Sequence, residues 1–287
     1  MKTRFVNLST LGLVVASLAG CNNVTEHNVS VYTGNTSAAE LNSSAVANRF
    51  VENYFAVNYS LTVSDLSGSP VYTRSTQTRS INLRSVQLVD DTFYGECGGY
   101  LDYQGIYDDF DDYLDVEVSA INFCEYGERF DGEMLIQGYP DALSIDYLNF
   151  NYRDDYYGTD YTLYGDVLIE ERYPLTKVTT NLIVDDNLLR QSYRLRNWQE
   201  IFDESVYPSE RSLSGEITDS VFGSVEVVTL QPIITDYYGQ PEAGQLLILG
   251  YRSSAWVTFY SSGYLVEVDR DDDAFIDDSD LYGYHYY

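Results

Sequence analysis

From Tyr59 onward, apolar and polar residues alternate with a period of two, in short runs separated by Gly, Asp, Asn, Ser and Pro. Successive side chains of a strand point to opposite faces, so this alternation predicts strands with one buried and one wet face. No long helical pattern interrupts the runs, which argues against parallel crossovers and for antiparallel pairing. The clearest runs are residues 116–121, 143–148, 179–184, 225–230, 255–260 and 264–268.

This pattern predicts an all-β fold: an antiparallel meander of repeated hairpins in an extended or curled sheet, with open, sandwich and half-barrel forms as alternatives. One short helix is expected over residues 37–55, because Ser37 and Glu40 have the spacing of a capping box and apolar residues recur at helical spacing after them. Residues 37–287 are expected to form a single β-rich domain, a length that supports one large core.

A short repeat runs through the predicted strands. Its first element is Asn, an aromatic residue, any residue and an acid, and it begins at Asn122, Asn151 and Asn197. Its second element is an apolar residue, any residue, Gly, an acid and an apolar residue, in that order. The glycines of this element are Gly132, Gly165 and Gly215, with a variant at Gly244. An aromatic ring lying across a strand glycine offsets the poor strand preference of glycine. We interpret the repeat as structural, with the Asn residues closing loops; the alternative is chance recurrence.

Residues 1–20 have the layout of a secretory signal, with Lys2 and Arg4 ahead of an apolar run over residues 11–18 that is too short to cross a bilayer as a helix. The run ends in Leu-Ala-Gly-Cys, which resembles the lipobox of bacterial lipoproteins. By that resemblance Cys21 carries the fatty-acyl anchor, palmitate included, and becomes the first residue of the mature chain.

Residues 21–36 are rich in Asn, Ser, Thr and Val and are expected to form a flexible tether between the lipid and the domain. In lipoproteins an Asp directly after the acylated Cys favours the inner membrane. Here Asn22 and Asn23 follow Cys21, so the resemblance implies the outer membrane, facing either the periplasm or the surface.

The strands also resemble those of uncharacterised β-rich lipoproteins of Gram-negative bacteria, through the aromatic-Asn-aromatic run Phe150-Asn-Tyr and a following strand of Gly-x-apolar type. The resemblance covers roughly residues 115–270. It implies a fold and brings no catalytic residues.

The chain is strongly acidic, with 16 basic and 45 acidic residues. Removing Lys2 and Arg4 with the signal leaves 14 basic residues and a net charge of −31. Such a charge opposes nucleic acid and anionic lipid head groups, and favours metal ions or cationic surfaces as partners. A high-salt environment is an alternative explanation that needs no partner.

Besides Cys21, the chain has Cys97 and Cys124. A single pair in an exported protein predicts one disulfide bond, which would contribute about 3.5 kcal/mol in the loop-entropy model. The only histidines are His27, in the expected tether, and His285, near the end of the chain. Ser-His, Cys-His and His-ligated zinc chemistries are therefore disfavoured. We interpret Lys177 as an exposed lysine of an edge strand and not as a Schiff-base amine.

Carboxylate chemistry stays open, because two acids at the right separation suffice to hydrolyse glycosides. The run 107–113 of alternating Tyr, Phe and Asp residues, together with Tyr100 and Tyr103, offers aromatic surfaces beside hydrogen-bond acceptors, as sugar binding requires. Such residues also decorate the wet faces of ordinary sheets, which is the interpretation we favour.

Residues 268–280, VDRDDDAFIDDSD, hold a further candidate site. EF-hand ligand offsets fall on Asp269, Asp271, Asp273, the carbonyl of Phe275, Asp277 and Asp280. The loop resembles a degenerate dockerin-type calcium loop entered from a strand, with Ala274 where Gly is usual, at a cost of about 1 kcal/mol. Its oxygen ligands favour Ca²⁺, with a dissociation constant on the order of 10⁻⁴ to 10⁻³ M. The alternative is a solvated acidic tail.

Together these features predict a lipid-anchored cell-envelope protein with a structural or binding role, stabilised by calcium and partnered by a glycan or another envelope protein. A carbohydrate-active enzyme or glycan-binding module that uses paired carboxylates and surface tyrosines is the alternative.

Overall fold

The structure is a computed structural model that describes residues 32–60, 86–108, 112–125, 127–139, 141–156, 158–203, 205, 210–236 and 240–284, without the side chains of residues 56–60 and 86–87. The expected signal peptide, the lipidation site Cys21, most of the tether and both histidines lie outside the described residues.

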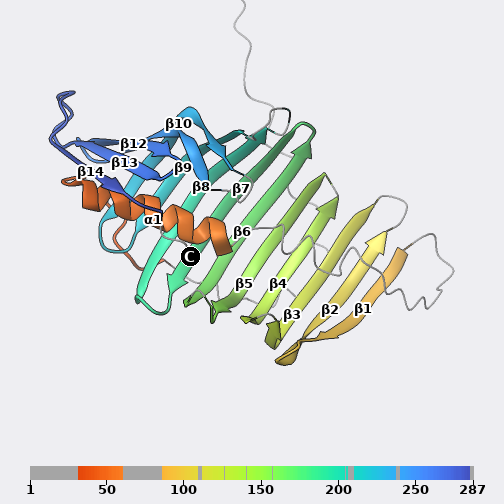
Figure 1. Cartoon of the computed structure of the whole chain (residues 1–287). Coiled ribbons are helices and arrows are strands. Elements are labelled where there is room, and N and C mark those ends of the chain that lie inside the picture. Colours follow the sequence, from red (N-terminus) through yellow and green to blue (C-terminus); the bar gives the residue numbers. More distant parts are fainter. Residues whose placement is uncertain are drawn as a thin grey trace, which may run out of the picture.

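The predicted antiparallel meander is confirmed. The strands in the described part of the chain form one 14-stranded sheet in which each strand pairs with its neighbours in the chain, and the sheet stays open (Figure 1). The strands are β1 (Val86–Tyr94), β2 (Gly98–Asp108), β3 (Tyr113–Glu125), β4 (Glu128–Tyr139), β5 (Ala142–Asp154), β6 (Thr159–Arg172), β7 (Leu175–Asp186), β8 (Gln191–Asp203), β9 (Glu210–Asp219), β10 (Gly223–Thr235), β11 (Pro241–Leu249), β12 (Ser254–Tyr260), β13 (Gly263–Asp269) and β14 (Asp278–Tyr282).

Because the strands pair in chain order, the turns between them lie at the two ends of the strands. Each line of strand ends is called an edge here, as distinct from the edge strands β1 and β14. Every turn that follows an odd-numbered strand lies at one edge, which we call the odd-turn edge. Every turn that follows an even-numbered strand lies at the other, the even-turn edge. Lys177 lies in β7, which pairs with both β6 and β8, so its interpretation as an edge-strand lysine is wrong.

The one helix among the described residues, α1 (Ser44–Ser60), begins later than the expected start at residue 37. Residues around Ser37 instead extend along the sheet, where Ala38 forms a parallel bridge with Ser224. At the true start, the Ser43 hydroxyl accepts the Val46 amide and the Asp278 carboxylate accepts the Ser44 amide at 2.8 Å. The helix start is therefore set by a local cap and by a side chain from the far end of the chain.

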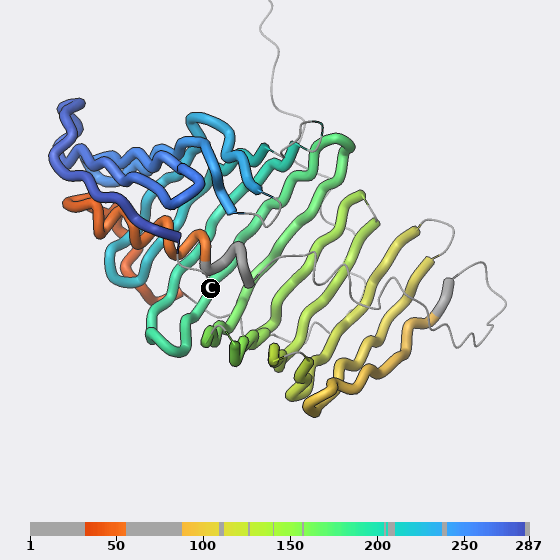
Figure 2. The backbone as a smooth tube through the Cα atoms, in the orientation of Figure 1, coloured from red at the N-terminus to blue at the C-terminus, as the bar shows by residue number. Residues whose placement is uncertain are grey.

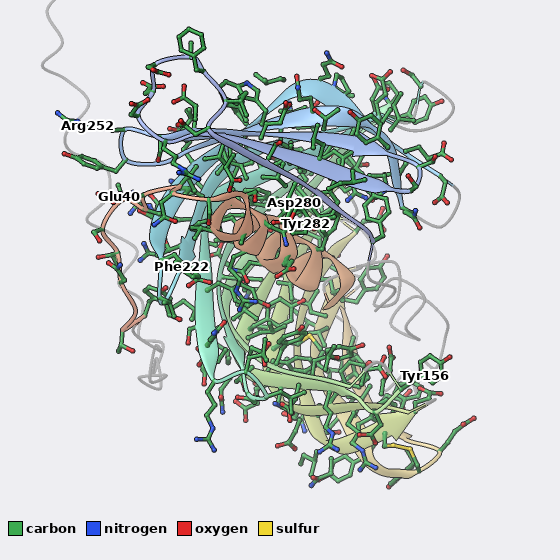
Figure 3. All side chains as sticks on the ribbon, turned by 60° about the vertical axis from the view of Figure 1, so that its left-hand side comes forward. Glu40, Tyr156, Phe222, Arg252, Asp280 and Tyr282 are labelled. Atoms are coloured by element: carbon green, nitrogen blue, oxygen red, sulfur yellow. A yellow bond between two sulfur atoms is a disulfide. The ribbon has the colours of Figure 1, made fainter. Side chains whose placement is uncertain are left out.

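The strands β10 to β14 bend back over the sheet, and α1 lies inside this bend (Figures 1 and 2). Figure 3, turned by 60°, shows α1 beneath the last strands and against the middle of the sheet. The ring of Tyr54 packs 5.4 Å from that of Trp198 in β8, and the ring of Phe55 packs 6.2 Å from that of Phe259 in β12. The largest fully buried side chains are those of Trp198, Tyr193, Phe50 and Phe259.

The repeat corresponds to β-bulges in the strands. Asn122 and Asn197 have positive φ angles of 48°, and the strand register shifts at each of them. In the middle copy the positive-φ residue is Asn149, not Asn151. These Asn residues lie inside strands, so the prediction that they close loops is wrong. Asn tolerates the left-handed conformation that a bulge requires, which is why it recurs there.

The glycines of the repeat make room for these bulges. A Cβ on Gly132 would lie 2.2 Å from the carbonyl oxygen of Asn149 in the next strand, so only glycine fits there. A Cβ on Gly215 would lie 3.1 Å from a ring carbon of Trp198. At Gly215, the expected aromatic ring across a strand glycine is therefore present.

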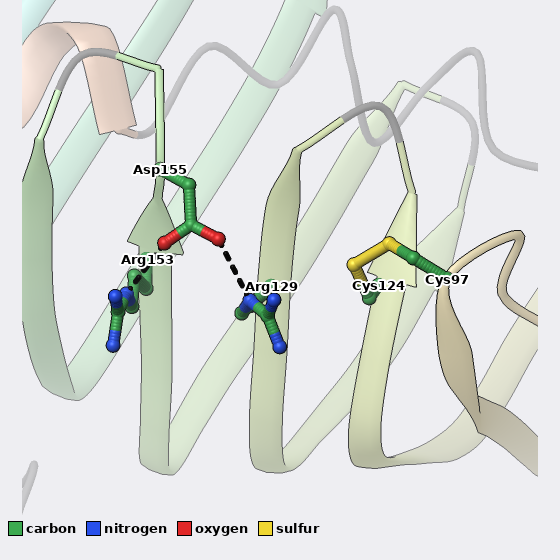
Figure 4. Close-up of a disulfide and its surroundings, with 5 residues drawn as sticks. All are labelled: Cys97, Cys124, Arg129, Arg153 and Asp155. Carbon is green, nitrogen blue, oxygen red and sulfur yellow. Dashed lines mark hydrogen bonds and ion pairs between the residues drawn. A yellow bond between two sulfur atoms is a disulfide. The ribbon is translucent and has the colours of Figure 1, made fainter.

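The disulfide predicted from the cysteine count joins Cys97, in the turn between β1 and β2, to Cys124, near the end of β3 (Figure 4). Beside it the Asp155 carboxylate accepts the Arg129 Nε at 2.9 Å and the Arg153 Nε at 2.8 Å, and the two guanidinium groups lower the pKa of Asp155. The first strands are thus cross-linked covalently, and the next turns are linked by an exposed ion-pair network.

Candidate functional site

The acidic loop between β13 and β14 is organised around Asp269, the last residue of β13. Asp269 is buried, and its carboxylate accepts the amides of Asp271, Asp272, Asp273 and Ala274, the shortest at 2.7 Å. Burial alone would raise the pKa of Asp269, but these four donors together hold it below its ordinary value. Most of the hydrogen-bonding capacity of this carboxylate is therefore used to hold its own loop.

The structure brings three of the predicted ligands together. Asp269, Asp271 and Asp273 each offer a carboxylate oxygen within 4.8 Å of the others. Repulsion from Asp273, then burial, and then the charges of Asp277 and Asp269 raise the pKa of Asp271. A cation would relieve this repulsion, and only oxygen ligands are offered, which suits a hard ion such as Ca²⁺.

The remaining predicted ligands are placed differently. The Asp277 carboxylate accepts the Arg270 amide at 2.9 Å, so it faces the start of the loop. Asp280 lies on β14, opposite Val266 of β13, and accepts the amide of Leu281. The amide of Phe275 donates to Asp273, and the Phe275 side chain is 74 % exposed. The cluster among the described residues therefore comprises three carboxylates, fewer than the six to eight ligands Ca²⁺ usually takes.

Ala274 adopts the left-handed conformation, with φ of 69°, at the position where an EF-hand has Gly. Its amide donates to Asp269 Oδ2 at 2.8 Å, and this hydrogen bond offsets part of the conformational cost of about 1 kcal/mol. The departure from the EF-hand sequence thus does not prevent the turn.

A second candidate site is an open groove of about 510 Å³ on the wet face of the sheet, between the extended residues before α1 and strands β8 to β11. The bulge at Asn197 shapes it, and the Asn197 amide donates to the Asn181 side chain at 2.8 Å. The lining residues with polar side chains are Arg196, Asn197, Gln199, Ser214, Glu216, Ser224 and Glu226.

Two arginines flank Glu216: Arg196 lines the groove with it, and Arg194 lies outside the lining residues. Arg194 Nη2 lies 3.2 Å from Glu216 Oε1, and Arg196 Nη2 lies 3.9 Å from Glu216 Oε2. Hydrogen bonds from a guanidinium to a carboxylate are charge-assisted, so they hold the Glu216 side chain in place. The groove offers amides, hydroxyls and a guanidinium to a polar ligand.

An acid pair stands elsewhere on the wet face. Asp146 of β5 is directly opposite Asp166 of β6, a position in which Cβ atoms are about 5 Å apart. Burial, and then the charge of Asp166, raise the pKa of Asp146. Asn181 donates to Asp166 at 3.0 Å. Neither acid lines the groove described above.

The tyrosines proposed as a sugar platform do not share one surface. Tyr103 is buried, at 4 % exposure. Tyr100 packs on Tyr94 with ring centroids 6.3 Å apart, and the Tyr107 hydroxyl donates to Asp112 at 2.8 Å. Asp109, Phe110 and Asp111 lie outside the described residues.

Sequence reasoning missed the groove and the polar anchors of α1. Arg211 of β9 donates to Tyr54 of α1 at 3.0 Å and lies 3.8 Å from Glu200 of β8, which also accepts Trp198 Nε1 at 3.1 Å. Asn53 of α1 donates to buried Asp219 at 2.9 Å. These partners are far apart in the sequence, and the one available signal was Asn197, which the repeat had marked as structural.

Among the residues that the structure describes, no helix combines the length and apolarity needed to cross a membrane. Comparisons of the chain with protein-family models, curated proteins and solved structures find no match.

Proposed function

We propose that this chain is a lipid-anchored cell-envelope protein, held at the outer membrane through Cys21, with a binding or structural role and no catalysis. The lipobox-like run before Cys21 supports the anchor. The groove on the wet face supports binding, because it gathers polar groups around an open surface.

The observation that carries the binding role is that Glu216, which lines the groove together with Arg196, is paired with Arg196 and with Arg194 beside the groove. A carboxylate oriented by neighbouring guanidinium groups presents its remaining lone pairs as hydrogen-bond acceptors. With the amides of Asn197 and Gln199, it matches the hydroxyl groups of a glycan, and an envelope glycan is the ligand class we assign.

Affinity electrophoresis in gels that contain soluble envelope polysaccharide tests this assignment. Arg196→Ala removes a lining guanidinium and is expected to reduce retardation several-fold. Arg172→Ala is the matched control, because Arg172 lies at the even-turn edge and is 86 % exposed. Equal retardation of both variants and the parent would contradict the groove as the binding site.

A carbohydrate-active enzyme is the alternative that one observation favours: the Asp146 and Asp166 pair, in which one pKa is raised. A reducing-end assay with the same polysaccharides separates the two proposals. Binding without new reducing ends supports ours; turnover that disappears in Asp146→Asn would replace it with the enzyme.

Intact mass of the protein purified from membranes tests the anchor separately. An acyl-bearing Cys21 is the expected first residue, and Cys21→Ser is expected to release the protein from the membrane fraction. An unmodified N-terminus at any other residue would refute the anchor without bearing on the groove.

A further inference from the structure

Three neighbouring hairpin tips at the odd-turn edge expose apolar side chains. They connect β7 to β8, β9 to β10 and β11 to β12. Their exposed apolar residues are Leu188, Leu189, Val221, Phe222 and Tyr251. Tips of successive hairpins are two strand spacings apart, about 10 Å, so these residues form one row, which we call the apolar tip row.

In two of the tips the acidic side chain is buried and the apolar side chains are exposed, whereas turns usually expose their polar residues. Asp186 and Asp219, which precede them, are 9 % and 1 % exposed. The Asp186 carboxylate accepts the amides of Leu188 and Leu189, at 2.9 and 2.7 Å. The Asp219 carboxylate accepts the amides of Val221 and Phe222, at 2.8 and 3.2 Å. The acids thus face inward and fix the turns, while the apolar side chains face outward.

The tips also differ from the rest of the chain in charge. Residues 187–190, 220–222 and 250–253 contain no acid, although the chain has 45, and they contain Arg190 and Arg252. The Arg252 guanidinium lies 5.7 Å from the centre of the Tyr251 ring. Exposed apolar residues beside Tyr and Arg are typical of surfaces that meet the head-group region of a bilayer.

The described chain begins beside the same tips. The Asn35 amide donates to the Ser220 carbonyl at 3.0 Å, and the Tyr251 amide donates to the Ala39 carbonyl at 2.6 Å. Figure 3 shows Phe222, Glu40 and Arg252 along one side of the molecule. Tyr156, in the earlier odd turn between β5 and β6, lies away from them, so the row is confined to the later tips. From Tyr32, eleven residues lead back to Cys21, and a chain of that length reaches at most about 38 Å.

We infer that the apolar tip row rests on the head-group region of the bilayer that holds the acyl chain, so that the sheet stands with this part of its odd-turn edge toward the membrane. The inference rests on the lipid anchor of the proposed function. The anchor keeps these tips beside the bilayer at high local concentration, so weak apolar contacts suffice. The lack of acids at these three tips avoids charge repulsion there. The next turn at the same edge, residues 270–277, carries Asp271, Asp272, Asp273 and Asp277, so the membrane contact ends at the β11 to β12 tip.

Tryptophan fluorescence on neutral vesicles of phosphatidylcholine and phosphatidylethanolamine tests this orientation. The full acylated chain carries either Leu189→Trp, in the row, or Tyr173→Trp, an 88 % exposed control at the even-turn edge. Vesicles are expected to shift the emission of the Leu189→Trp variant to the blue, and brominated acyl chains to quench it several-fold more than the control. The two native tryptophans, buried Trp198 and half-buried Trp256 of β12, are common to both variants and give them the same background.

Equal quenching of the two variants would overturn the inference. A blue shift in Leu189→Trp without vesicles, together with a doubled mass in light scattering, would show that a second copy covers the row, and would also overturn it. The unacylated chain, tethered to nickel-chelating lipid by a polyhistidine tag placed before residue 22, separates the two proposals. Selective quenching there supports the row even if Cys21 proves unmodified.

Discussion

The two ends of the sheet are held by different means. At the β8 to β14 end, α1 is packed into the bend of the sheet through aromatic rings and buried polar anchors drawn from distant parts of the chain. At the β1 to β3 end, the described residues show a disulfide between a turn and a strand. In a meander the strands pair only with their neighbours in the chain, so contacts between distant segments must come from elsewhere. Side-chain packing supplies them at one end of this sheet, and a covalent bond supplies them at the other.

The packed end should be the more sensitive to truncation. Trp198→Ala removes a ring that contacts both α1 and Gly215 and leaves a cavity, so we expect a loss of about 4 kcal/mol in the free energy of unfolding. Urea denaturation followed by circular dichroism measures it. Leu188→Ala, at an exposed tip, is the control and should change stability little.

Removal of the disulfide at the β1 to β3 end should lower the free energy of unfolding by less than Trp198→Ala does. Replacing both Cys97 and Cys124 by Ser is expected to cost about 3.5 kcal/mol of unfolding free energy. Hydrogen exchange should rise in β1 to β3 and stay unchanged in α1, because the disulfide constrains only the first strands. Faster exchange in α1 would mean that the two ends are one cooperative unit.

Stability should also depend on pH through the packed end. Burial raises the pKa of Glu200, although Arg211 and Trp198 oppose the shift. A raised pKa in the folded state means that the stabilising contribution is complete below the ordinary Glu pKa and is lost as pH rises through the folded value. We expect Glu200→Gln to remove the fall in unfolding free energy between the ordinary Glu pKa and the higher pKa of folded Glu200. Parallel curves for the two proteins would contradict this.

The smallest expected effect concerns the acidic loop, which lies at the packed end. Millimolar Ca²⁺ should raise the free energy of unfolding by about 1 kcal/mol, and a chelator should reverse the change. Asp271→Asn should abolish the response, because Asp271 belongs to the carboxylate cluster. The EF-hand offsets include Asp280 as a ligand, so by them Asp280→Asn should weaken the response to Ca²⁺. The structure places Asp280 on β14, away from the cluster, so by the structure the response should stay unchanged. Magnesium in place of calcium is the control for general charge screening.

The regular part of this fold could be predicted from the sequence, because strand alternation is a local property. Runs such as 143–148 alternate within a few residues, and the Asn and Gly residues of the repeat report bulges that form between neighbouring strands. Even there, the choice of Asn149 over Asn151 depends on the register with β4 and β6, which the motif does not encode.

Features that join distant segments could not be predicted. The Asp278 carboxylate accepts the amide of Ser44 at the start of α1. Arg211 of β9 links Glu200 of β8 to Tyr54 of α1. The groove depends on residues before α1 lying along β10, which no periodic pattern reveals. In the acidic loop, spacing correctly grouped Asp269, Asp271 and Asp273, but the start of β14 moved Asp280 along the sheet.

Pairing in chain order also bears on how such a chain can change in length. Duplication or loss of one whole hairpin adds or removes two strands, so every later turn stays at the same edge and every later side chain keeps its face. Loss of a single strand would move all later turns to the opposite edge. Lineages of this fold should therefore differ by even numbers of strands, with the changes confined to the stretch between the disulfide and the strands that hold α1.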